Sequence, residues 1–291
     1  MKRIILLGCT IASCAVYAQP FLDVVRINYC YSPEAGLNKK TNPLTSNFFN
    51  VNVNLPIELK KGGDAFIINP FFEQNQGKVS GTDFHVLSKG LFVGFLKRNL
   101  FPDWNLLSAI TIRRNKEAGK DLANDWQYGG ALLATYRQSE HLSLKFGIYY
   151  NREFFGNYFI PLAGIDWQIN DKNALFGVLP GNFVFEHRVS KRFTYGSAFR
   201  ALTNSYRLET TDPCGSGDCT GQNYLRIDDN QLGAYADTYL SKQIVLSAES
   251  GYTIFRRYRY GFKGENTHQK TDYYSDNFYV RASLVYRMAL R

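Results

Sequence analysis

Residues 49–59 alternate strictly between apolar and polar side chains, and this period of two constrains the fold more than any other feature of the chain. Phe49, Val51, Val53, Leu55, Ile57 and Leu59 fall on one side, and Asn50, Asn52, Asn54, Pro56 and Glu58 fall on the other. Successive side chains of a β-strand point to opposite faces, so the run predicts a strand with one apolar and one polar face. The same alternation recurs at 128–136, 142–151 and 278–288. The sequence therefore predicts an all-β protein.

Two all-β architectures fit such strands, a soluble sandwich and a transmembrane β-barrel. The polar faces favour the barrel, because they carry mainly Asn, Ser, Thr, Gly and Gln with scattered Arg. The runs are also ~10 residues or longer, whereas strands of soluble proteins average ~5–6. The chain contains 20 Tyr and 22 Phe, and these cluster near the run ends, as in the aromatic girdles of membrane barrels. After residue 18 no apolar run approaches the ~18 residues of a spanning helix.

The first 18 residues have the layout of a secretory signal peptide. A basic pair, Lys2 and Arg3, precedes the uncharged apolar stretch 4–16, and small residues lead to a cleavage position after Ala18. We expect residues 1–18 to be removed on export. A lipoprotein signal that ends before Cys14 is the alternative.

The number of strands follows from counting the alternating runs over residues 19–291. Thirteen runs are found, at 22–32, 46–59, 64–73, 85–97, 104–114, 126–137, 142–152, 157–169, 173–189, 192–209, 222–240, 243–258 and 275–289. Single-chain bacterial barrels have even strand numbers. The run 173–189 contains Pro180-Gly181-Asn182, a turn signal, and a split there gives fourteen strands. Fusing or discarding a run gives twelve, so the prediction is a single antiparallel transmembrane β-barrel of 12–14 strands.

The connections between the runs fall into a short and a long class. The short ones are 60–63, 138–141, 170–172, 190–191 and 241–243, and the long ones are 33–45, 74–84, 115–125, 210–221 and 259–274. In outer-membrane barrels short turns face the periplasm and long loops face outward. Only with a reversal near Pro180 do all the short turns fall on one side, which supports the split.

Three cysteines remain after signal cleavage. Cys214 and Cys219 flank a four-residue loop, and in an oxidising envelope we expect them to form a disulfide. Cys30 would then be a lone buried thiol. The spacing does not fit a zinc site, and no metal or cofactor is predicted.

The polar strand faces supply candidates for the lining of a lumen. These are Asn50, Asn52, Asn54, Glu58, Arg137, Lys145, Glu186, Arg188, Arg200, Glu249 and Arg281. Charged groups that point inward either line a pore or lock it through ion pairs. Sequence leaves these two alternatives open.

The formal net charge is +9, and an exported chain rarely meets nucleic acid, so we expect anionic lipids or anionic solutes as partners. Four cations interleaved with aromatic residues, Arg256, Arg257, Arg259 and Lys263, are expected to face lipopolysaccharide at the membrane interface. The barrel-assembly machinery is the expected partner during insertion. The oligomeric state is open.

Chemistry of a catalytic kind is sparse. His141 and Ser143 share one strand face, as a base and a nucleophile would, but they lie at a short turn and have no evident third polar partner. Asp228 and Asp229 are adjacent, and adjacent strand residues face opposite ways, which argues against a dyad. Together with Asp212 and Asp218 they could offer oxygen ligands to Ca²⁺, without the spacing of a known calcium loop. We therefore predict no enzymatic activity.

One stretch, Asn157 to Tyr206, resembles a Bacteroidota family of uncharacterised outer-membrane β-barrel proteins. The matching segments are 161–167 (PLAGIDW), 175–180 (LFGVLP), 183–186 (FVFE) and 189–193 (VSKRF). Cleavage directly before Gln19 is similar to signal peptides of that phylum. The resemblance implies an outer-membrane barrel and implies no activity or site residues.

The function expected from these observations is that of a narrow passive channel for small polar or anionic solutes in the bacterial outer membrane. One alternative is a structural or surface-interaction barrel with a plugged lumen. An outer-membrane hydrolase is a weaker alternative.

Overall fold

The computed structural model describes residues 21–34, 44–59, 63–79, 82–209, 224–261, 270–273 and 276–289. The predicted signal peptide lies outside the described residues, as do Cys214 and Cys219. Among the described residues no helix is long and apolar enough to cross a membrane.

The described chain consists of β-strands joined by turns and loops. The strands are β1 (Phe21–Ser32), β2 (Leu44–Val53), β3 (Leu55–Glu58), β4 (Ala65–Val79), β5 (Thr82–Phe101), β6 (Trp104–Glu117), β7 (Trp126–Arg137), β8 (Leu142–Glu153), β9 (Gly156–Gln168), β10 (Asn173–Leu179), β11 (Asn182–Arg188), β12 (Phe193–Arg207), β13 (Tyr224–Tyr239), β14 (Ile244–Gly261), β15 (Lys270–Tyr273) and β16 (Phe278–Ala289).

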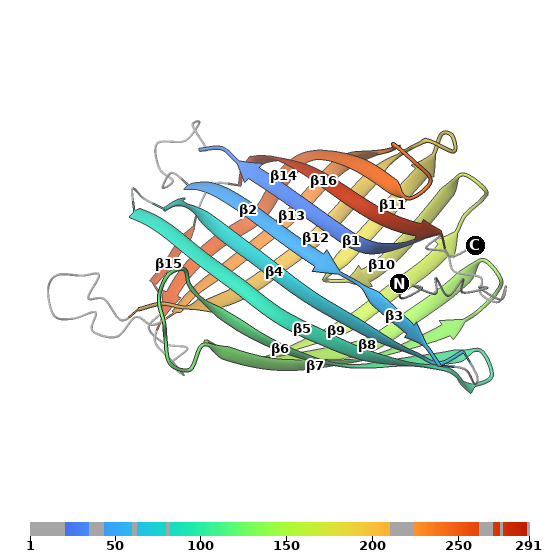
Figure 1. Cartoon of the computed structure of the whole chain (residues 1–291), viewed down its shortest axis with the longest axis horizontal. Coiled ribbons are helices and arrows are strands. Elements are labelled where there is room, and N and C mark those ends of the chain that lie inside the picture. The colour runs from blue at the N-terminus through green and yellow to red at the C-terminus, as the bar shows by residue number, and fades with distance from the viewer. Residues whose placement is uncertain are drawn as a thin grey trace, which may run out of the picture.

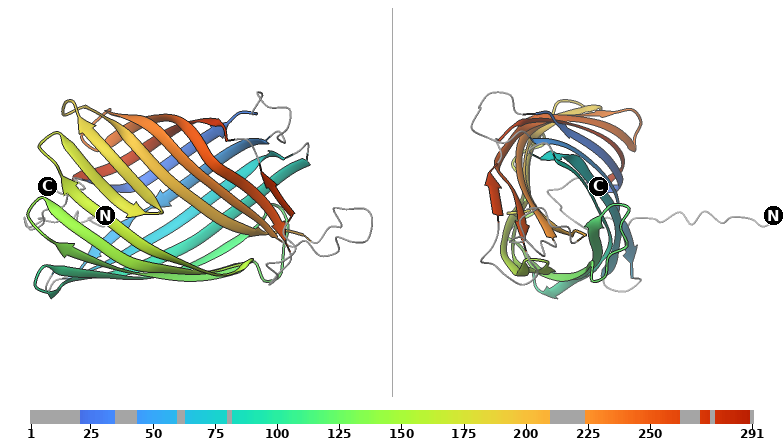
Figure 2. Two further views of the ribbon diagram at one scale, coloured as in Figure 1. Left: turned by 180° about the vertical axis from the view of Figure 1, so that it is seen from behind. Right: turned by 90° about the vertical axis from the view of Figure 1, so that its left-hand side faces the viewer.

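The strands form one antiparallel sheet that closes on itself. Each wall strand pairs with its neighbour in sequence, and β1 pairs with β16, which pairs with β14 (Figure 1). β2 and β3 both pair with β4 and form one wall strand with an interruption at Asn54, and β15 is an extension beside β14. The wall therefore has fourteen strands. Seen from the long-loop end, the barrel has an elongated cross-section (Figure 2).

The reversal predicted at Pro180 is confirmed. β10 and β11 form an antiparallel hairpin that turns at Pro180 and Gly181. The first residue of β1 and the last residue of β16 lie at the short-turn end of the barrel (Figure 1). We call this the inner end, because short turns face the periplasm, and the opposite end the outer end.

The predicted long loop over 74–84 is wrong. β4 continues to Val79 and pairs with β5 down to Thr82, so only residues 80 and 81 connect the two strands. Gln74 and Gln76 made this stretch look like a loop because they put polar groups on the outer face. Strands that extend beyond the hydrocarbon region can carry polar side chains on both faces and still pair.

The outer surface carries the apolar face of the alternating runs. Phe49 is 36% exposed whereas its neighbour Asn50 is 8% exposed. At mid-height Ile110, Leu132 and Ile148 are half or more exposed. Contact of so many apolar side chains with water is unfavourable, whereas the hydrocarbon core of a lipid bilayer accommodates them.

Exposed aromatic side chains gather above and below this apolar belt. Tyr31, Trp126, Tyr128, Phe159 and Phe278 lie toward the outer end, and Phe66, Phe101, Trp167, Phe193, Tyr195 and Tyr286 lie toward the inner end. Rings with a polar edge are typical of the two membrane–water interfaces. The closed wall, the belt and the two girdles identify an outer-membrane barrel, as predicted.

Candidate functional site in the barrel lumen

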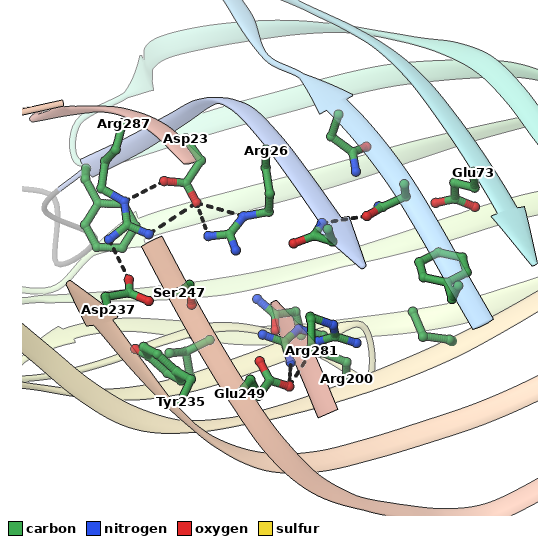
Figure 3. A pocket seen from close by; sticks show the side chains of 18 of the residues that line it. Asp23, Arg26, Glu73, Arg200, Tyr235, Asp237, Ser247, Glu249, Arg281 and Arg287 are labelled. Carbon is green, nitrogen blue, oxygen red and sulfur yellow. Dashed lines mark hydrogen bonds and ion pairs between the residues drawn. The ribbon is translucent and has the colours of Figure 1, made fainter. Parts of the chain in front are cut away.

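A cavity of about 330 Å³ lies inside the barrel, from near the inner end to mid-height (Figure 3). Its lining includes four arginines, Arg26, Arg200, Arg281 and Arg287, and four carboxylates, Asp23, Glu73, Asp237 and Glu249. The amides of Asn28, Asn50 and Asn52 add further polar surface. The lining thus carries both signs of charge in equal number.

Arg287 of β16 connects the charged side chains nearest the inner end. Its Nε donates to Asp23 Oδ1 at 2.6 Å, and its Nη1 donates to Asp237 Oδ2 at 2.8 Å. Asp23 also accepts from Arg26 Nε at 3.1 Å. The Arg287 guanidinium lies 3.6 Å from the centre of the Phe21 ring, in a cation–π contact. Two guanidiniums and two carboxylates neutralise one another here.

Glu249 of β14 organises a second group of charges at mid-height. It accepts from Arg200 Nη1 at 2.6 Å, from Arg281 Nη1 at 3.0 Å and from the Tyr279 hydroxyl at 2.7 Å. Arg281 also donates to the amide oxygen of Gln231. Since one carboxylate serves two guanidiniums, this group has an excess of one positive charge.

Glu73 of β4 differs from the other carboxylates of the cavity. It lines both the main cavity and a smaller one of about 40 Å³ toward the outer end. Among the described residues, none forms a hydrogen bond or an ion pair with its carboxylate. Its electrostatic neighbour Arg113 directs its donors to Gln127, Asn204 and Glu153 instead. Glu73 is therefore an unpaired charge on the cavity wall.

The lumen is closed above the smaller cavity by an apolar cluster that we call the outer plug. Its buried members come from five strands and are Leu44, Phe84, Val86, Tyr206, Leu225, Ile227 and Tyr258. The rings of Phe84 and Tyr258 lie 5.6 Å apart. Val86 and Tyr258 are fully buried, so side chains of the plug pack closely against one another in this part of the lumen.

A second apolar contact narrows the lumen near the inner end. Phe21 of β1 meets Phe176 of β10 edge to face, with 6.2 Å between ring centres. β1 and β10 are six strands apart around the wall, so the contact crosses the lumen. Both rings also line the main cavity, so the contact narrows this cavity near the inner end.

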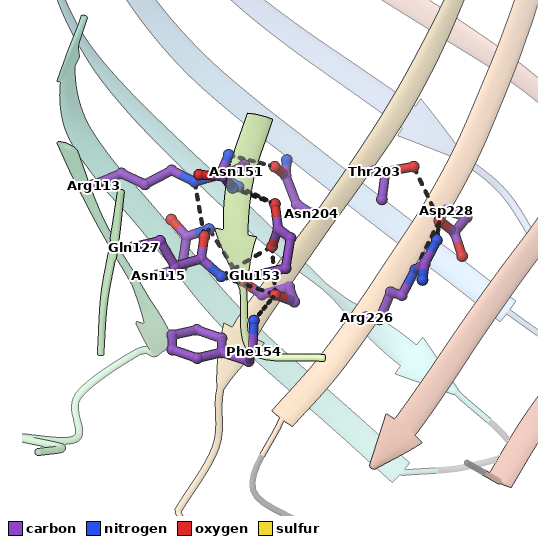
Figure 4. Close-up of polar contacts among 11 residues, drawn as sticks. Arg113, Asn115, Gln127, Asn151, Glu153, Phe154, Thr203, Asn204, Arg226 and Asp228 are labelled. Carbon is purple, nitrogen blue, oxygen red and sulfur yellow. Dashed lines mark hydrogen bonds and ion pairs between the residues drawn. The ribbon is translucent and has the colours of Figure 1, made fainter. Parts of the chain in front are cut away.

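The outer part of β12 reaches across the barrel toward β6, β7 and β8 (Figure 4). β10 and β11 end early, so β12 has no β11 partner beyond Arg200. Arg207 instead pairs with Lys116 of β6, from the far side of the strand order. Ser205 and Glu153 join the facing strands, with Gln127 Nε2 donating to Ser205 Oγ at 2.8 Å and to Glu153 Oε2 at 2.9 Å. These polar bonds hold the outer end narrow.

The structure brings five of the predicted lumen residues to the main cavity: Asn50, Asn52, Arg200, Glu249 and Arg281. Four others lie outside its lining but are wholly or partly buried: Asn54, Lys145, Glu186 and Arg188. Lys145 is paired with Asp166 at 2.7 Å.

Glu58 and Arg137 do not line the cavity, contrary to expectation. Both are exposed near the inner end, and Arg137 Nη2 pairs with Asp103 at 2.6 Å. At the ends of the wall both strand faces meet water, so alternation no longer identifies an inward side chain.

Arg256 was expected to face lipopolysaccharide, and the structure places it inside the barrel. It is 2% exposed, its Nη1 donates to Ser32 Oγ at 3.0 Å, and its Nε lies 3.3 Å from Asp229 Oδ1. The cause is a β-bulge at Phe255, where φ is +55° and the register with β13 shifts. An extra residue in a strand exchanges the faces of all residues that follow it.

The other members of the predicted lipopolysaccharide-facing set have different positions. Arg259 pairs with Asp228, Arg257 is partly buried, and Lys263 lies outside the described residues.

The catalytic alternatives gain no support from the geometry. His141 is exposed at the inner-end turn before β8. Asp228 accepts hydrogen bonds from Thr203 and Arg226 (Figure 4). Asp229 instead pairs with Arg256, so the two carboxylates belong to separate groups. Within the described ranges no three His, Cys, Asp or Glu side chains gather as metal ligands, and Asp212 and Asp218 lie outside those ranges.

Sequence reasoning missed several residues of the lumen, above all Glu73. The run that contains it seemed to end there, because a loop was expected from residue 74. Glu73 is the last residue of the predicted run 64–73, and it is an even number of residues from Asn69 and Asn75. Continuing the alternation past residue 73 would have placed all three side chains on the polar face. Arg287 lies on the polar face of the run 278–288, as Arg281 does, but was not included among the predicted lumen residues. Asp23 precedes a register shift between β1 and β16, which hides its face from the sequence.

Comparison with known proteins gives a family and a set of distant barrels. A family model described as Domain of unknown function (DUF6268) matches residues 87–287. A comparison with curated proteins finds no match.

Among solved structures, the chain is similar to an outer membrane channel from Pseudomonas putida F1, with a TM-score of 0.45, 10% identity and coverage of 97% of this chain and 99% of that chain. It is also similar to the P. putida toluene transporter TodX (TM-score 0.42, 7% identity, 91% and 89% coverage). The NanC porin gives a TM-score of 0.40 at 9% identity, with 90% and 100% coverage. At these identities the likeness extends to the barrel fold only.

Proposed function

Since the chain belongs to this family of unknown function, which supplies no activity, we propose a function from the lumen itself: a narrow passive channel for small polar solutes. The main cavity carries the proposal. It is a chamber of about 330 Å³ with charged and amide side chains on its wall, inside a barrel that spans the outer membrane. Such a chamber stabilises a hydrated or polar solute within an otherwise apolar bilayer.

The described conformation is, in this proposal, the closed form of the channel. The outer plug lies between the chamber and the outer end, and the Phe21–Phe176 contact narrows the chamber near the inner end. Passage requires the outer parts of β12, β13 and β14 to move away from β5 and β6. The bonds of Ser205 and Glu153 to the facing strands oppose that movement.

The charge of the chamber refines the class of solute. Four arginines and four carboxylates balance, so the lining gives no physical reason for a general preference for anions. Small polar solutes without a large net charge fit it better. We also propose outer-membrane lipids and lipopolysaccharide as partners of the outer surface, and a Bacteroidota origin, and the sequence supports both.

The alternative is a structural barrel whose plug never opens. The fully buried Tyr258 and the cross-lumen bonds of Ser205 favour it. Current through single proteins in a planar bilayer separates the two. We expect rare, small openings of the unmodified protein and frequent, larger ones of the plug variant Tyr258→Ala.

Tyr195→Ala serves as the matched control, because Tyr195 is a tyrosine that is 46% exposed on the barrel exterior. Its current should equal that of the unmodified protein. If neither the unmodified protein nor Tyr258→Ala conducts, the barrel is not a channel.

A further inference from the structure

The two unbalanced charges of the main cavity lie on opposite walls. Glu73 is on β4, and Arg200, which shares Glu249 with Arg281, is on β12, six strands away around the wall. Figure 3 shows Glu73 on one side of the cavity and Arg200 and Arg281 on the other. The cavity lies between them, because all three residues line it.

Arg200 has donors to spare for a ligand. Only its Nη1 donates within the described residues, to Glu249 at 2.6 Å, and its side chain is 24% exposed. A guanidinium binds a carboxylate with two parallel hydrogen bonds, because its planar N–H donors match the two carboxylate oxygens. The Arg200 wall therefore fits a second carboxylate in addition to Glu249.

Glu73 offers the complementary charge. Its carboxylate has no hydrogen bond or ion pair within the described residues, and it faces both cavities. A carboxylate without a partner in a confined lumen attracts an ammonium group, which supplies several donors to its oxygens.

A ligand with only one charge satisfies half of this arrangement. An anion at Arg200 leaves Glu73 unpaired. A cation at Glu73 leaves the excess positive charge of Arg200 and Arg281, which share the carboxylate of Glu249, uncompensated. A ligand with no net charge but with both groups satisfies the two walls at once. Its size is also suitable, since about 330 Å³ is at the lower end of the roughly 300–1,000 Å³ of small-molecule sites.

We propose that the main cavity binds a small zwitterion, with its carboxylate on Arg200 and its ammonium on Glu73. The inference rests on the proposed function, in that it names the solute class of the channel. Free amino acids and the termini of short peptides share this chemistry.

The test measures binding to the purified full barrel in detergent by isothermal titration calorimetry, independently of transport. The probes are glycine, β-alanine, 4-aminobutyrate and 5-aminopentanoate, with triglycine for the peptide source. Acetate, propionate and butyrate, and the matching alkylamines, are the singly charged references. One member of the zwitterion series should bind about tenfold or more tightly than its reference acid and amine, as expected for a hydrogen bond between charged groups.

Variants assign the two walls. Glu73→Gln should weaken the best zwitterion about tenfold and remove its advantage over the carboxylic acid, and Arg200→Gln should remove its advantage over the amine. Glu73→Asp keeps the charge on a shorter side chain, so the preferred zwitterion should become longer. Glu58→Gln and Arg137→Gln are the controls, because both residues are exposed and outside the cavity lining.

Absence of binding by every zwitterion, or equal binding of zwitterions and singly charged references, would overturn the inference. So would a folded Glu73→Gln protein with unchanged preference. Bilayer current without zwitterion preference refutes this inference and leaves the channel in place. Zwitterion binding without current in the unmodified protein or in Tyr258→Ala refutes the channel and leaves a binding chamber.

Discussion

Glu153 lies near the outer end of β8 with a side chain that is 1% exposed, and it is bonded to several strands. It accepts from Arg113 of β6, Gln127 of β7 and Ser205 of β12. A buried carboxylate of this kind is stable only while its donors remain, and the donors depend equally on the carboxylate. Glu153 therefore provides the negative charge around which the donors of the cross-lumen contact gather.

We predict that Glu153→Gln lowers the free energy of unfolding by about 3–5 kcal/mol, because the largely buried Arg113 loses its counter-charge. Urea unfolding in lipid vesicles, followed by tryptophan fluorescence, measures the change. Asp103→Asn is the control, since Asp103 pairs with Arg137 while both are nearly half exposed, and it should cost no more than about 1 kcal/mol. Equal effects of the two substitutions would contradict a structural role for Glu153.

For single residues, the sequence predicts which side chains face the lumen only where the alternation is unbroken. Asn50, Glu249 and Arg281 were predicted to face the lumen because unbroken alternation fixes their side of the sheet. Arg256 follows a bulge, and a bulge has no clear signature in a run of aromatic and basic residues. The partners within the lumen were also beyond prediction, because they depend on which strands face one another across the barrel.

At the scale of strands, the β10–β11 hairpin determines the shape of the barrel. Each of its strands has 7 residues, whereas β12 has 15. The early turn leaves the outer part of β12 free to cross the lumen. The Pro-Gly pair makes this turn readable from sequence. The crossing of β12 toward β6 could not be predicted from sequence, because it follows from the early end of β11 and not from the residues of β12.

Gly177 in β10 permits the close approach of the two hairpin strands. Its φ is +142°, and a Cβ atom would lie 2.2 Å from the Asn182 oxygen and 2.8 Å from the Phe183 Cα. An unusual φ alone costs about 1–3 kcal/mol when glycine is replaced. We predict that Gly177→Ala lowers the free energy of unfolding by more than this, because the backbone atoms of Asn182 and Phe183 must also move. The loss is measured by heating samples to a series of temperatures and then separating folded from unfolded barrels by electrophoresis in the cold.

Gly156 is the matched control for Gly177. Its φ is +124°, and nothing lies within 4 Å of an added Cβ. Gly156→Ala should therefore show the strain alone, about 1–3 kcal/mol. A loss at Gly177 no larger than that at Gly156 would show that the hairpin can relax around a side chain.

At the scale of the whole molecule, the barrel combines an outer surface made for lipid with an interior that is almost filled. The wall has enough strands for a passage, yet its elongated section and the crossing of β12 narrow the interior, and the main cavity among the described residues has a volume of only about 330 Å³. Strand number alone thus predicts the presence of a lumen but not its width. The width depends on side chains that meet across it, such as Phe21 and Phe176.

The position of the bilayer follows from the apolar belt and gives a prediction that depends on depth. Leu132 is 50% exposed in the middle of β7, and Leu240 is 62% exposed at the inner-end turn after β13. Leu132→Arg should lower the free energy of unfolding in vesicles by about 2–4 kcal/mol, because it places a charge near the bilayer midplane, whereas Leu240→Arg should cost about 0–1 kcal/mol. The chemical change is the same, so the difference between the two isolates depth. Equal costs would mean that the membrane does not surround the barrel at the level of Leu132.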